Sequence, residues 1–481
     1  MIFNSLTYLL LLIVVVPLYW VLSYRARLLL IFVASITFYG FWRIEFIPVL
    51  MFSVVVDWLL ALRMSTVADK QRIKLLYFSI LINIGLLIYF KYLMFFTDNF
   101  IWFANIFGAN LEPIILNIIL PLGISFYTFQ TISYTVDVYR RHIKPEKNFL
   151  LYACYVTFFP QLVAGPILRA REVMEQFVGR NSFRIEHITW GLRRILYGLF
   201  LKVALADNIA PLVDDGYKMP VDTLSALDVW TLAFLFGFQI YFDFSAYSHI
   251  AIGSARLLGI VFPENFNFPY MASSPRDFWK RWHISLSSWI RDYLYLPLTG
   301  AKVMNKSTEG LTISTTKNSN NLALYATWAI MGLWHGANWT FVIWGVYHAI
   351  LVNIYRLISP LGKRINGRFK TLLGVTVTLP FMMLGWVPFR AETIDQTLGM
   401  WIKVLDLSGY FWLGMRENTY LVTFVLFLGV ILLASLKKVF FVDLPQTNFA
   451  KQLLDFIAVT VMVSAVIVFL RPISQFIYFQ F

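Results

Sequence analysis

The sequence DVWTLAFLFGFQIYFDFSAYSHI, residues 228–250, is apolar over its first half and carries several polar side chains over its second half. A transmembrane helix needs about 20 mostly apolar residues, so this stretch is long enough to span a bilayer. A charged group at membrane depth is costly and marks a site where it is paired or used. We therefore expect a membrane-spanning helix that holds a polar cluster in its second half.

Asp243 is the charged residue of this cluster and needs a partner. We expect Arg281, Arg291 or a histidine to supply it. Two roles stay open for the cluster, namely a buried ion pair that fixes helix packing and a contribution to substrate binding. For the second role the candidates are Tyr241, Asp243 and Ser245.

Similar apolar runs occur along the whole chain. Hydrophobic residues make up 59% of its 481 residues and charged residues only 14%, whereas soluble domains are about 45–50% apolar. We therefore expect an all-α, polytopic membrane protein with a single transmembrane domain over residues 1–481. Further spanning runs lie near residues 6–22, 28–42, 45–61, 75–96, 114–138, 188–205, 371–389, 419–436 and 453–478. Shorter or interrupted runs, some of which we expect to be re-entrant or broken helices, lie near 149–168, 284–298, 322–334 and 339–356.

The formal net charge of +14 does not indicate a nucleic-acid partner, because the basic residues fall in short loops between apolar runs. The loops 62–74, 140–147 and 356–370 are rich in Lys and Arg, and 97–113 has none. The positive-inside rule then places the basic loops in the cytoplasm and both termini outside. The loop 299–321, rich in Lys, Ser, Thr and Asn, is expected to be a mobile cytoplasmic insert.

The first candidate catalytic residue is His335, in the sequence MGLWHGANWT at residues 331–340. Imidazole is the side chain best suited to move a proton near neutral pH. The flanking glycines allow close backbone approach, Trp334 provides an aromatic wall, and Asn338 can orient the imidazole or a substrate carbonyl. The alternative is a structural histidine that bonds a neighbouring helix, which is how we interpret His348.

The second candidate is His283, in the sequence DFWKRWHISLSSWIRDYLY at residues 277–295. The pattern predicts an amphipathic helix at the cytoplasmic interface, with Trp282 and Trp289 on one face. Its basic residues, Arg281 among them, suit phosphates or lipid head groups. The alternative is an interfacial anchor without a chemical role.

Other catalytic patterns are missing from the sequence. It contains no phosphate-binding loop, no dinucleotide-binding glycine motif, no nucleophile elbow and no zinc-protease helix motif. Six scattered histidines without paired carboxylates do not predict a catalytic metal, and the lone Cys154 excludes an internal disulfide. We expect no bound cofactor.

Taken together, the motifs resemble the membrane-bound O-acyltransferase family, and within it the bacterial alginate O-acetyltransferase-like branch. The resemblance implies a bundle of about 11 transmembrane helices, with re-entrant or interfacial helices, around a central tunnel, and a catalytic core over residues 120–350. The stretches that carry it lie at 121–140, 159–169, 202–207, 241–253, 264–270, 278–295 and 334–340.

By this resemblance, His335 matches the family's essential histidine and His283 its second motif histidine. The family moves an acyl group from a cytoplasmic thioester, such as acetyl-CoA, to a hydroxyl reached from the other side of the membrane. Substrate and donor binding is then expected from Asn338, Trp334, Arg281, Trp282, Trp279, Asp243, Ser245 and Tyr241.

The expected function is therefore O-acetylation of an exopolysaccharide such as alginate at a bacterial inner membrane. The expected partners are membrane lipids, the acyl donor and a periplasmic acetyltransferase of the SGNH type. Alternatives left open are peptidoglycan or another cell-surface glycan as acceptor, D-alanyl transfer to teichoic acid, and a lipid or glycan flippase without covalent chemistry. The sequence does not identify the acceptor, the acyl chain or the oligomeric state.

Overall fold

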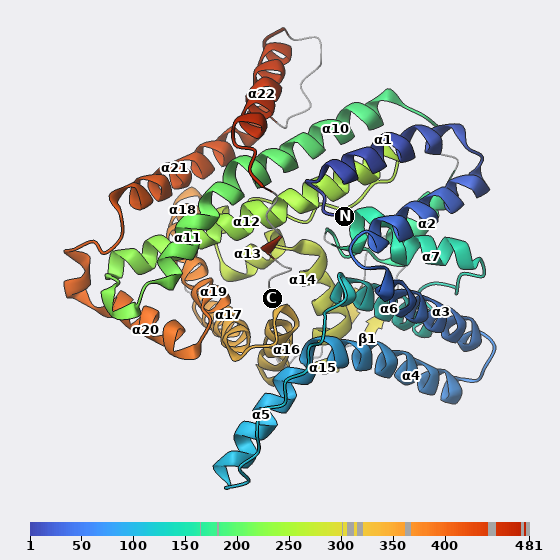
Figure 1. Cartoon of the computed structure of the whole chain (residues 1–481), viewed down its shortest axis with the longest axis horizontal. Coiled ribbons are helices and arrows are strands. Elements are labelled where there is room, and N and C mark those ends of the chain that lie inside the picture. The colour runs from blue at the N-terminus through green and yellow to red at the C-terminus, as the bar shows by residue number, and fades with distance from the viewer. Residues whose placement is uncertain are drawn as a thin grey trace. The chain divides into compact units, whose positions relative to one another are not determined.

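The computed structural model of the chain describes residues 1–163, 165–179, 182–300, 302–304, 312–314, 321–360, 367–440, 449–472 and 476–477 (Figure 1). These residues are helical, apart from connecting segments and one short antiparallel pair, β1 (Lys302–Met304) and β2 (Thr312–Ser314). The all-α prediction is confirmed. Much of the predicted insert 299–321 lies outside the described residues.

The chain forms two compact units, each discontinuous in sequence. The first comprises residues 1–194, 250–263 and 288–318, and the second comprises 195–249, 264–287 and 319–481. The prediction of a single transmembrane domain concerns the whole chain and stays a prediction. Helices α10 (Ile185–Leu199), α12 (Ala226–Leu257) and α14 (Ile284–Ile290) contribute residues to both units.

The first unit contains most of the N-terminal helices. Its elements are α1 (Leu6–Val21), α2 (Tyr24–Gly40), η1 (Ile44–Phe46), α3 (Ile47–Met64), α4 (Asp69–Leu87), η2 (Ile88–Tyr92), α5 (Leu93–Ile106), α6 (Ile124–Tyr139), α7 (Phe149–Thr157), α8 (Phe159–Leu162), α9 (Ala170–Val178), η6 (Arg291–Tyr295), α15 (Leu296–Leu298), β1 and β2.

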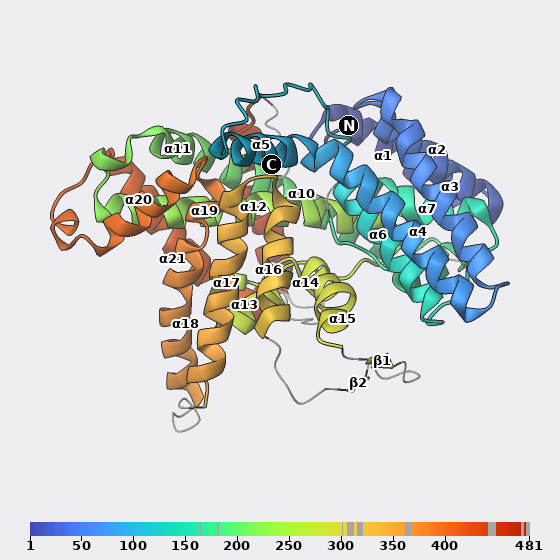
Figure 2. The ribbon, with the colours of Figure 1, turned by 90° about the horizontal axis from the view of Figure 1, so that it is seen from below.

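Helices α3, α4 and α6 pack side by side (Figure 2). A cluster of buried polar side chains joins them. Asp57 accepts hydrogen bonds from Ser79 Oγ at 2.5 Å and from Asn83 Nδ2 at 2.7 Å. Ser53 and Thr131 donate to the amide oxygen of Asn83 at 2.8 and 3.0 Å. A buried carboxylate is tolerated when its oxygens are bonded in this way, so the cluster holds three apolar helices together.

Helix α6 begins later than its apolar run predicts. The run starts near residue 114, but the helix starts at Ile124. Gly123 has a φ of +72°, and a Cβ at this position would overlap the backbone oxygen of Leu162. Only glycine adopts this conformation at such a close approach without strain, so the helix begins directly after it.

The second unit contains the C-terminal helices. Its elements are η3 (Phe200–Ala206), α11 (Asp207–Lys218), η4 (Val221–Thr223), η5 (Pro269–Met271), α13 (Pro275–Arg281), α16 (Asn321–His335), α17 (Trp339–Ile358), α18 (Gly367–Leu384), α19 (Val387–Arg390), α20 (Ile394–Leu405), η8 (Leu407–Tyr410), α21 (Glu417–Phe440) and α22 (Phe449–Val468).

Six helical stretches of the described residues are long and apolar enough to cross a membrane. Three shorter apolar helices lie at Leu6–Val21, Glu417–Ile431 and Gln452–Val468. A polytopic membrane protein is therefore confirmed. The six spans are Ile44–Met64, Asp69–Ile106, Ile185–Lys218, Ala226–Leu257, Trp339–Ile358 and Phe369–Arg390.

One of the four interrupted runs, 149–168, is a broken helix: it divides into α7 and α8, with Pro160 in the first turn of α8. The run 284–298 is helical throughout and passes from α14 through the π-helical η6 into α15. The other two runs form the continuous helices α16 and α17, which lie side by side as a hairpin (Figure 2).

Candidate active site

All ten residues predicted for the site belong to the second unit. They come from α12, from α13 and the break that follows it, and from the hairpin of α16 and α17. The structure therefore places them within one compact part of the molecule.

His335 is the last residue of α16 and is 5% exposed. Its imidazole makes edge contacts with three aromatic rings, at centroid distances of 4.9 Å to Trp344, 5.0 Å to Trp334 and 5.1 Å to Phe389. These rings exclude water from the imidazole, and exclusion of water strengthens electrostatic and proton-transfer interactions.

The glycines around His335 set the close packing of the hairpin. A Cβ at Gly332 would overlap the backbone oxygen of Phe341, and a Cβ at Gly345 would overlap that of Trp328. The predicted close approach at Gly332 is thus confirmed. Because both glycines lie where α16 meets α17, the end of α16 is held rigidly against the start of α17.

Asn338 shapes the turn that follows His335. It is the N-cap of α17, where its Oδ1 accepts from the backbone N–H of Thr340 at 3.0 Å. Its Nδ2 donates to the backbone oxygen of Glu392 at 3.2 Å. Both ends of the amide are therefore engaged in holding the turn, and a role of Asn338 toward substrate stays a prediction.

His283 lies in a break between two helices. Helix α13 ends at Arg281 and α14 begins at Ile284. His283 itself has a φ of +40°, which non-glycine residues rarely adopt, and its side chain is fully buried. The prediction of one amphipathic helix over this stretch is therefore wrong, and its location at the membrane interface stays a prediction. Strained backbone of this kind is concentrated at functional sites.

Asn265 fixes the proton on the His283 ring. Asn265 Oδ1 accepts from the backbone N–H of Ser285 at 3.2 Å, so this atom is the carbonyl oxygen of the amide. It lies 3.2 Å from His283 Nδ1. Because a carbonyl oxygen only accepts, Nδ1 carries the proton and Nε2 is the basic nitrogen of the neutral ring. Burial lowers the pKa of His283 to about 3, so the ring is neutral at physiological pH.

Arg281 pairs within its own helix. Its Nε lies 2.9 Å from Asp277 Oδ1, and Nη1 donates to the backbone oxygen of Asn267 at 3.4 Å. About a third of its side chain is exposed. The predicted contact with donor phosphates is not tested by this geometry.

The predicted tryptophans Trp279 and Trp282 pack in aromatic surroundings. Trp282 is 2% exposed and contacts Trp386 at a centroid distance of 4.7 Å. Trp279 contacts Trp344 and His348 at 5.7 and 5.0 Å. These residues therefore do not form the exposed face of an interfacial helix.

A chain of ring contacts joins the surroundings of the two candidate histidines. From Trp344, which touches His335, it runs to Trp386 at 6.3 Å and on to Trp282. It continues to Phe266 at 5.2 Å, whose ring lies 6.4 Å from that of His283. The two motifs thus belong to one aromatic core.

Asp243 pairs with Lys202. The Nζ atom of Lys202 lies 2.7 Å from Asp243 Oδ1 and 2.9 Å from Asp207 Oδ1. The backbone N–H of Ile477 donates to Asp243 Oδ2 at 2.8 Å. The expected partners Arg281, Arg291 or a histidine are therefore wrong, and the cluster satisfies the buried carboxylate as an ion pair.

The remaining predicted residues lie on the same helix, α12. Tyr241 packs against Tyr270 at a centroid distance of 5.4 Å and against Phe266 at 5.9 Å. Ser245 is buried one turn further along. Tyr241 thus touches the aromatic core that contains Trp282 and His283, whereas Asp243 faces Lys202.

Sequence reasoning missed three residues that the structure places in or beside the site: Lys202, Asn265 and Phe389. A signal existed for Lys202, because a lysine at the end of an apolar run needs a carboxylate as much as Asp243 needs a cation. No local pattern singles out Phe389, which meets His335 only through tertiary packing.

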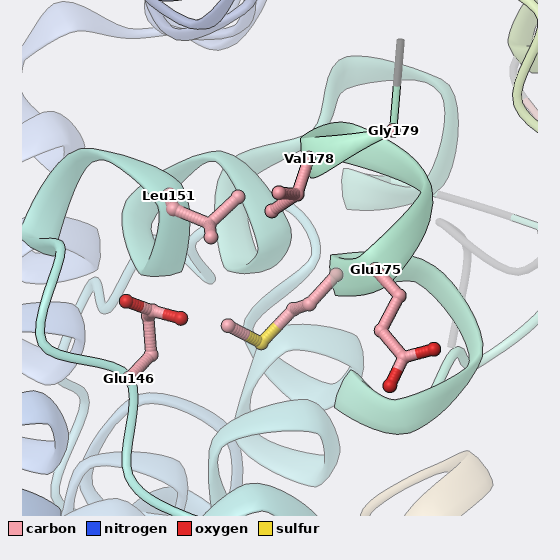
Figure 3. A pocket seen from close by; sticks show the side chains of 6 residues that line it. Glu146, Leu151, Glu175, Val178 and Gly179 are labelled. Carbon is pink, nitrogen blue, oxygen red and sulfur yellow. The ribbon is translucent and has the colours of Figure 1, made fainter. Parts of the chain in front are cut away.

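A cavity of about 330 Å³ lies in the first unit and contains none of the predicted residues (Figure 3). Glu146, Leu151, Met174, Glu175, Val178 and Gly179 line it. No group of three or more potential metal ligands is found among the described residues.

The family is decided by comparison with known proteins. A family model described as the membrane-bound O-acyltransferase family matches residues 140–387. The chain belongs to the membrane-bound O-acyltransferase family. The resemblance inferred from the motifs is thus confirmed, and the chain is a multi-pass membrane acyltransferase.

Individual relatives are similar over most of their length. The probable alginate O-acetylase AlgI of Azotobacter vinelandii is 37% identical over 398 residues, which cover 82% of this chain and 75% of the relative. The peptidoglycan O-acetyltransferase of Helicobacter pylori is 36% identical over 403 residues, covering 78% and 73%. The teichoic acid D-alanyltransferase of Bacillus subtilis is 28% identical over 286 residues, covering 57% and 70%.

Proposed function

We propose that this membrane O-acyltransferase moves an acetyl group from a cytoplasmic thioester, such as acetyl-CoA, to an extracytoplasmic hydroxyl. A periplasmic acetyltransferase of the SGNH type then passes the acetyl group to an exopolysaccharide such as alginate. The observation that carries the proposal is a buried imidazole, His335, at the end of α16 in contact with three aromatic rings. The names of the alginate O-acetylase relatives support the acceptor.

His335 acts as the general base. Its imidazole takes the proton of the acceptor hydroxyl as the oxygen attacks the thioester carbonyl, which forms the new C–O bond. When the tetrahedral intermediate collapses, the C–S bond breaks and the imidazolium returns its proton to the leaving thiolate. Proton and acyl group are thereby balanced, and the histidine ends in its starting state.

Asn338 has a positioning role in this scheme. Its side chain caps α17 and donates a hydrogen bond to the backbone oxygen of Glu392, so it fixes the turn that follows His335. The oxyanion of the intermediate needs a donor such as the Asn338 amide or a backbone N–H, because developing negative charge in a dry site is stabilised by fixed dipoles.

His283 assists from the other motif. The hydrogen bond from Nδ1 to Asn265 leaves Nε2 as the basic nitrogen of the ring. This nitrogen accepts a hydrogen bond from the acyl thioester or relays a proton. Arg281 and the neighbouring Lys280 and Arg276 supply positive charge on α13 for the phosphates of the donor. Trp279, Trp282 and Trp334 form apolar walls for the acyl arm.

Transfer across the membrane follows from the location of the two substrates. A charged thioester donor does not cross about 30 Å of hydrocarbon, so only its acyl arm needs to reach the buried imidazole. With the basic loops in the cytoplasm, the donor enters from that side and the acceptor hydroxyl from the outside. This orientation and a tunnel between the two faces are parts of the proposal.

Peptidoglycan is the second candidate acceptor, since the Helicobacter pylori relative is almost as similar as the alginate relatives. D-alanyl transfer to teichoic acid ranks below both because that relative covers less of the chain. A flippase is set aside because the family is one of acyltransferases.

The test uses the purified full chain in liposomes with acetyl-CoA labelled in the acetyl group. A candidate periplasmic partner is enclosed in the lumen or left out, and its acetylation is measured. Labelled partner that forms only with the enzyme present supports the proposal. Absence of transfer with alginate-type and peptidoglycan-type partners alike would overturn it.

A further inference from the structure

His348 is a buried histidine for which the mechanism above has no use. It lies in α17, is 0% exposed, and is surrounded by the rings of Trp279 and Trp344 at 5.0 Å each and of Trp328 at 5.7 Å. On another side, a Cβ at Gly385 would lie 2.8 Å from its Nε2. The imidazole is thus enclosed by indole rings and backbone.

This enclosure contains hydrogen-bonding atoms that no described residue satisfies. Both ring nitrogens of His348, and the Nε1 atoms of Trp279 and Trp344, are buried and have no hydrogen-bond partner within the described part of the chain. An unsatisfied buried polar group destabilises the folded protein, so several in one place point to a ligand. The two indole N–H groups and the lone pair of the imidazole, without any charge, match the carbonyl oxygen and the N–H of a neutral amide group.

The order of contacts along α17 identifies which ligand carries that amide. At the C-terminal end of the helix, the Arg276 guanidinium lies 5.9 Å from the ring centre of Tyr355. Two turns back lies His348, and one turn further back Trp344 meets His335. Three positions thus follow one another along α17. Arg276, a cation suited to phosphate, lies at the C-terminal end, the surroundings of His348 that suit an amide lie in the middle, and the general base His335 lies beside Trp344.

The lengths agree with a thioester donor of the pantetheine type. Eleven residues separate Tyr355 from Trp344, which is about 16 Å along a helix at 1.5 Å per residue. Thirteen bonds between phosphorus and sulfur, extended like a peptide backbone, span roughly 15 Å. The nitrogen of the amide nearest the sulfur is three bonds from it, roughly 3.5 Å, and Trp344 and His348 are about 6 Å apart along the helix, so this amide falls between these two residues.

We propose that His348, with the indole N–H groups of Trp279 and Trp344, binds the amide nearest the sulfur of the donor's pantetheine-type arm. The indoles donate to the amide oxygen, and the imidazole accepts from the amide N–H. This inference rests on the proposed function. It makes His348 a binding residue that recognises the donor arm, while His335 performs the proton transfer.

The test compares two small donors in the liposome assay. S-acetyl-N-acetylcysteamine carries this amide, and an S-acetyl alkanethiol of equal chain length does not. The wild type should use the amide-bearing donor with a kcat/KM about tenfold higher, the change expected when one buried polar site loses its partner. His348→Phe, which keeps an aromatic ring, should use both donors equally, and Trp279→Phe should reduce the preference in part.

Tyr347→Phe is the matched control, because the Tyr347 hydroxyl donates to Phe381 at the neighbouring helix. It should keep the wild-type preference. If His348→Phe does not fold, as judged by gel filtration, Trp279→Phe decides. A wild type without preference, or variants that keep it, would overturn the subsite. A wild type that transfers acetyl from no thioester would instead remove the proposed function itself.

Discussion

Lys202 Nζ lies 2.7 Å from Asp243 Oδ1, and both side chains are buried in the second unit. A buried ion pair gains little over an apolar pair, but loss of one partner leaves a charge without compensation. Lys202→Met or Asp243→Asn should therefore lower the free energy of unfolding by about 3–5 kcal/mol. Thermal unfolding of the purified variants in detergent measures the effect.

The control for this prediction is Lys218→Met, at an exposed lysine of α11. It should unfold like the wild type. The double variant Lys202→Met/Asp243→Leu removes both charges of this pair and should recover only part of the loss, because Asp207 also loses Lys202 as its partner. Single variants as stable as the control would show that the pair has no structural importance.

The helices and their apolar character were predictable because membrane spans are long and consist of apolar residues. The hairpin at His335 was not predicted, because its two runs were interpreted as interrupted; its local marks are the glycines and Asn338, which caps α17. The pairing of Asp243 with Lys202 was not predicted, because nothing in either run specifies which two helices meet.

The break at His283 was not predictable from periodicity. Trp282 and Trp289 are seven residues apart, which is typical of one helix face, yet the chain leaves the helix between them. The cause is a set of tertiary hydrogen bonds made by Asn265, which lies in a preceding loop. Its Nδ2 donates to Ser248 Oγ, and its Oδ1 accepts from the Ser285 backbone N–H and the His283 ring. A histidine at positive φ has no signature in the sequence.

The stability of the protein should depend on the titration of His283. Its ordinary pKa is 6.5, and burial lowers the value to about 3 in the folded state. Between these values the unfolded chain binds a proton that the folded chain does not, so protonation favours unfolding. Stability should be complete above about pH 6.5 and decrease as the pH falls toward 3.

Unfolding midpoints between pH 7.5 and 4.5 check this for the wild type and His283→Gln. The variant has no imidazole at this position, so its midpoint should decrease less on acidification. Parallel curves for the two proteins would mean that other groups cause the acid sensitivity.

Arg281 is predicted to serve the donor more than the fold. Its pair with Asp277 lies within one helix and is about a third exposed, so it contributes less than about 1 kcal/mol. Arg281→Ala should therefore leave unfolding almost unchanged and raise the apparent KM for acetyl-CoA severalfold. Asp277→Asn is the control, since it breaks the same pair but keeps the cation. An unchanged KM in Arg281→Ala favours a purely structural arginine.

The topology prediction places position 106 outside the cell. Ile106 is 59% exposed at the end of α5, and the native Cys154 is buried and should remain unlabelled. Ile106→Cys should react with a membrane-impermeant maleimide added to intact cells, whereas Lys70→Cys, at an exposed position in the first turn of α4, should react only after permeabilisation. The reverse pattern of labelling would contradict the orientation.

His335→Gln tests the general base. Glutamine keeps similar size and hydrogen bonding but does not accept a proton at neutral pH, and positioned proton transfer contributes about 10²–10⁴-fold. Acetyl transfer should decrease by at least that order, with insertion and unfolding like the wild type. His187→Gln, at a half-buried histidine of the first unit, is the control and should keep its activity. Near-normal transfer by the His335 variant would return this imidazole to a structural role, in which its contacts with Trp344 and Phe389 only fill the core.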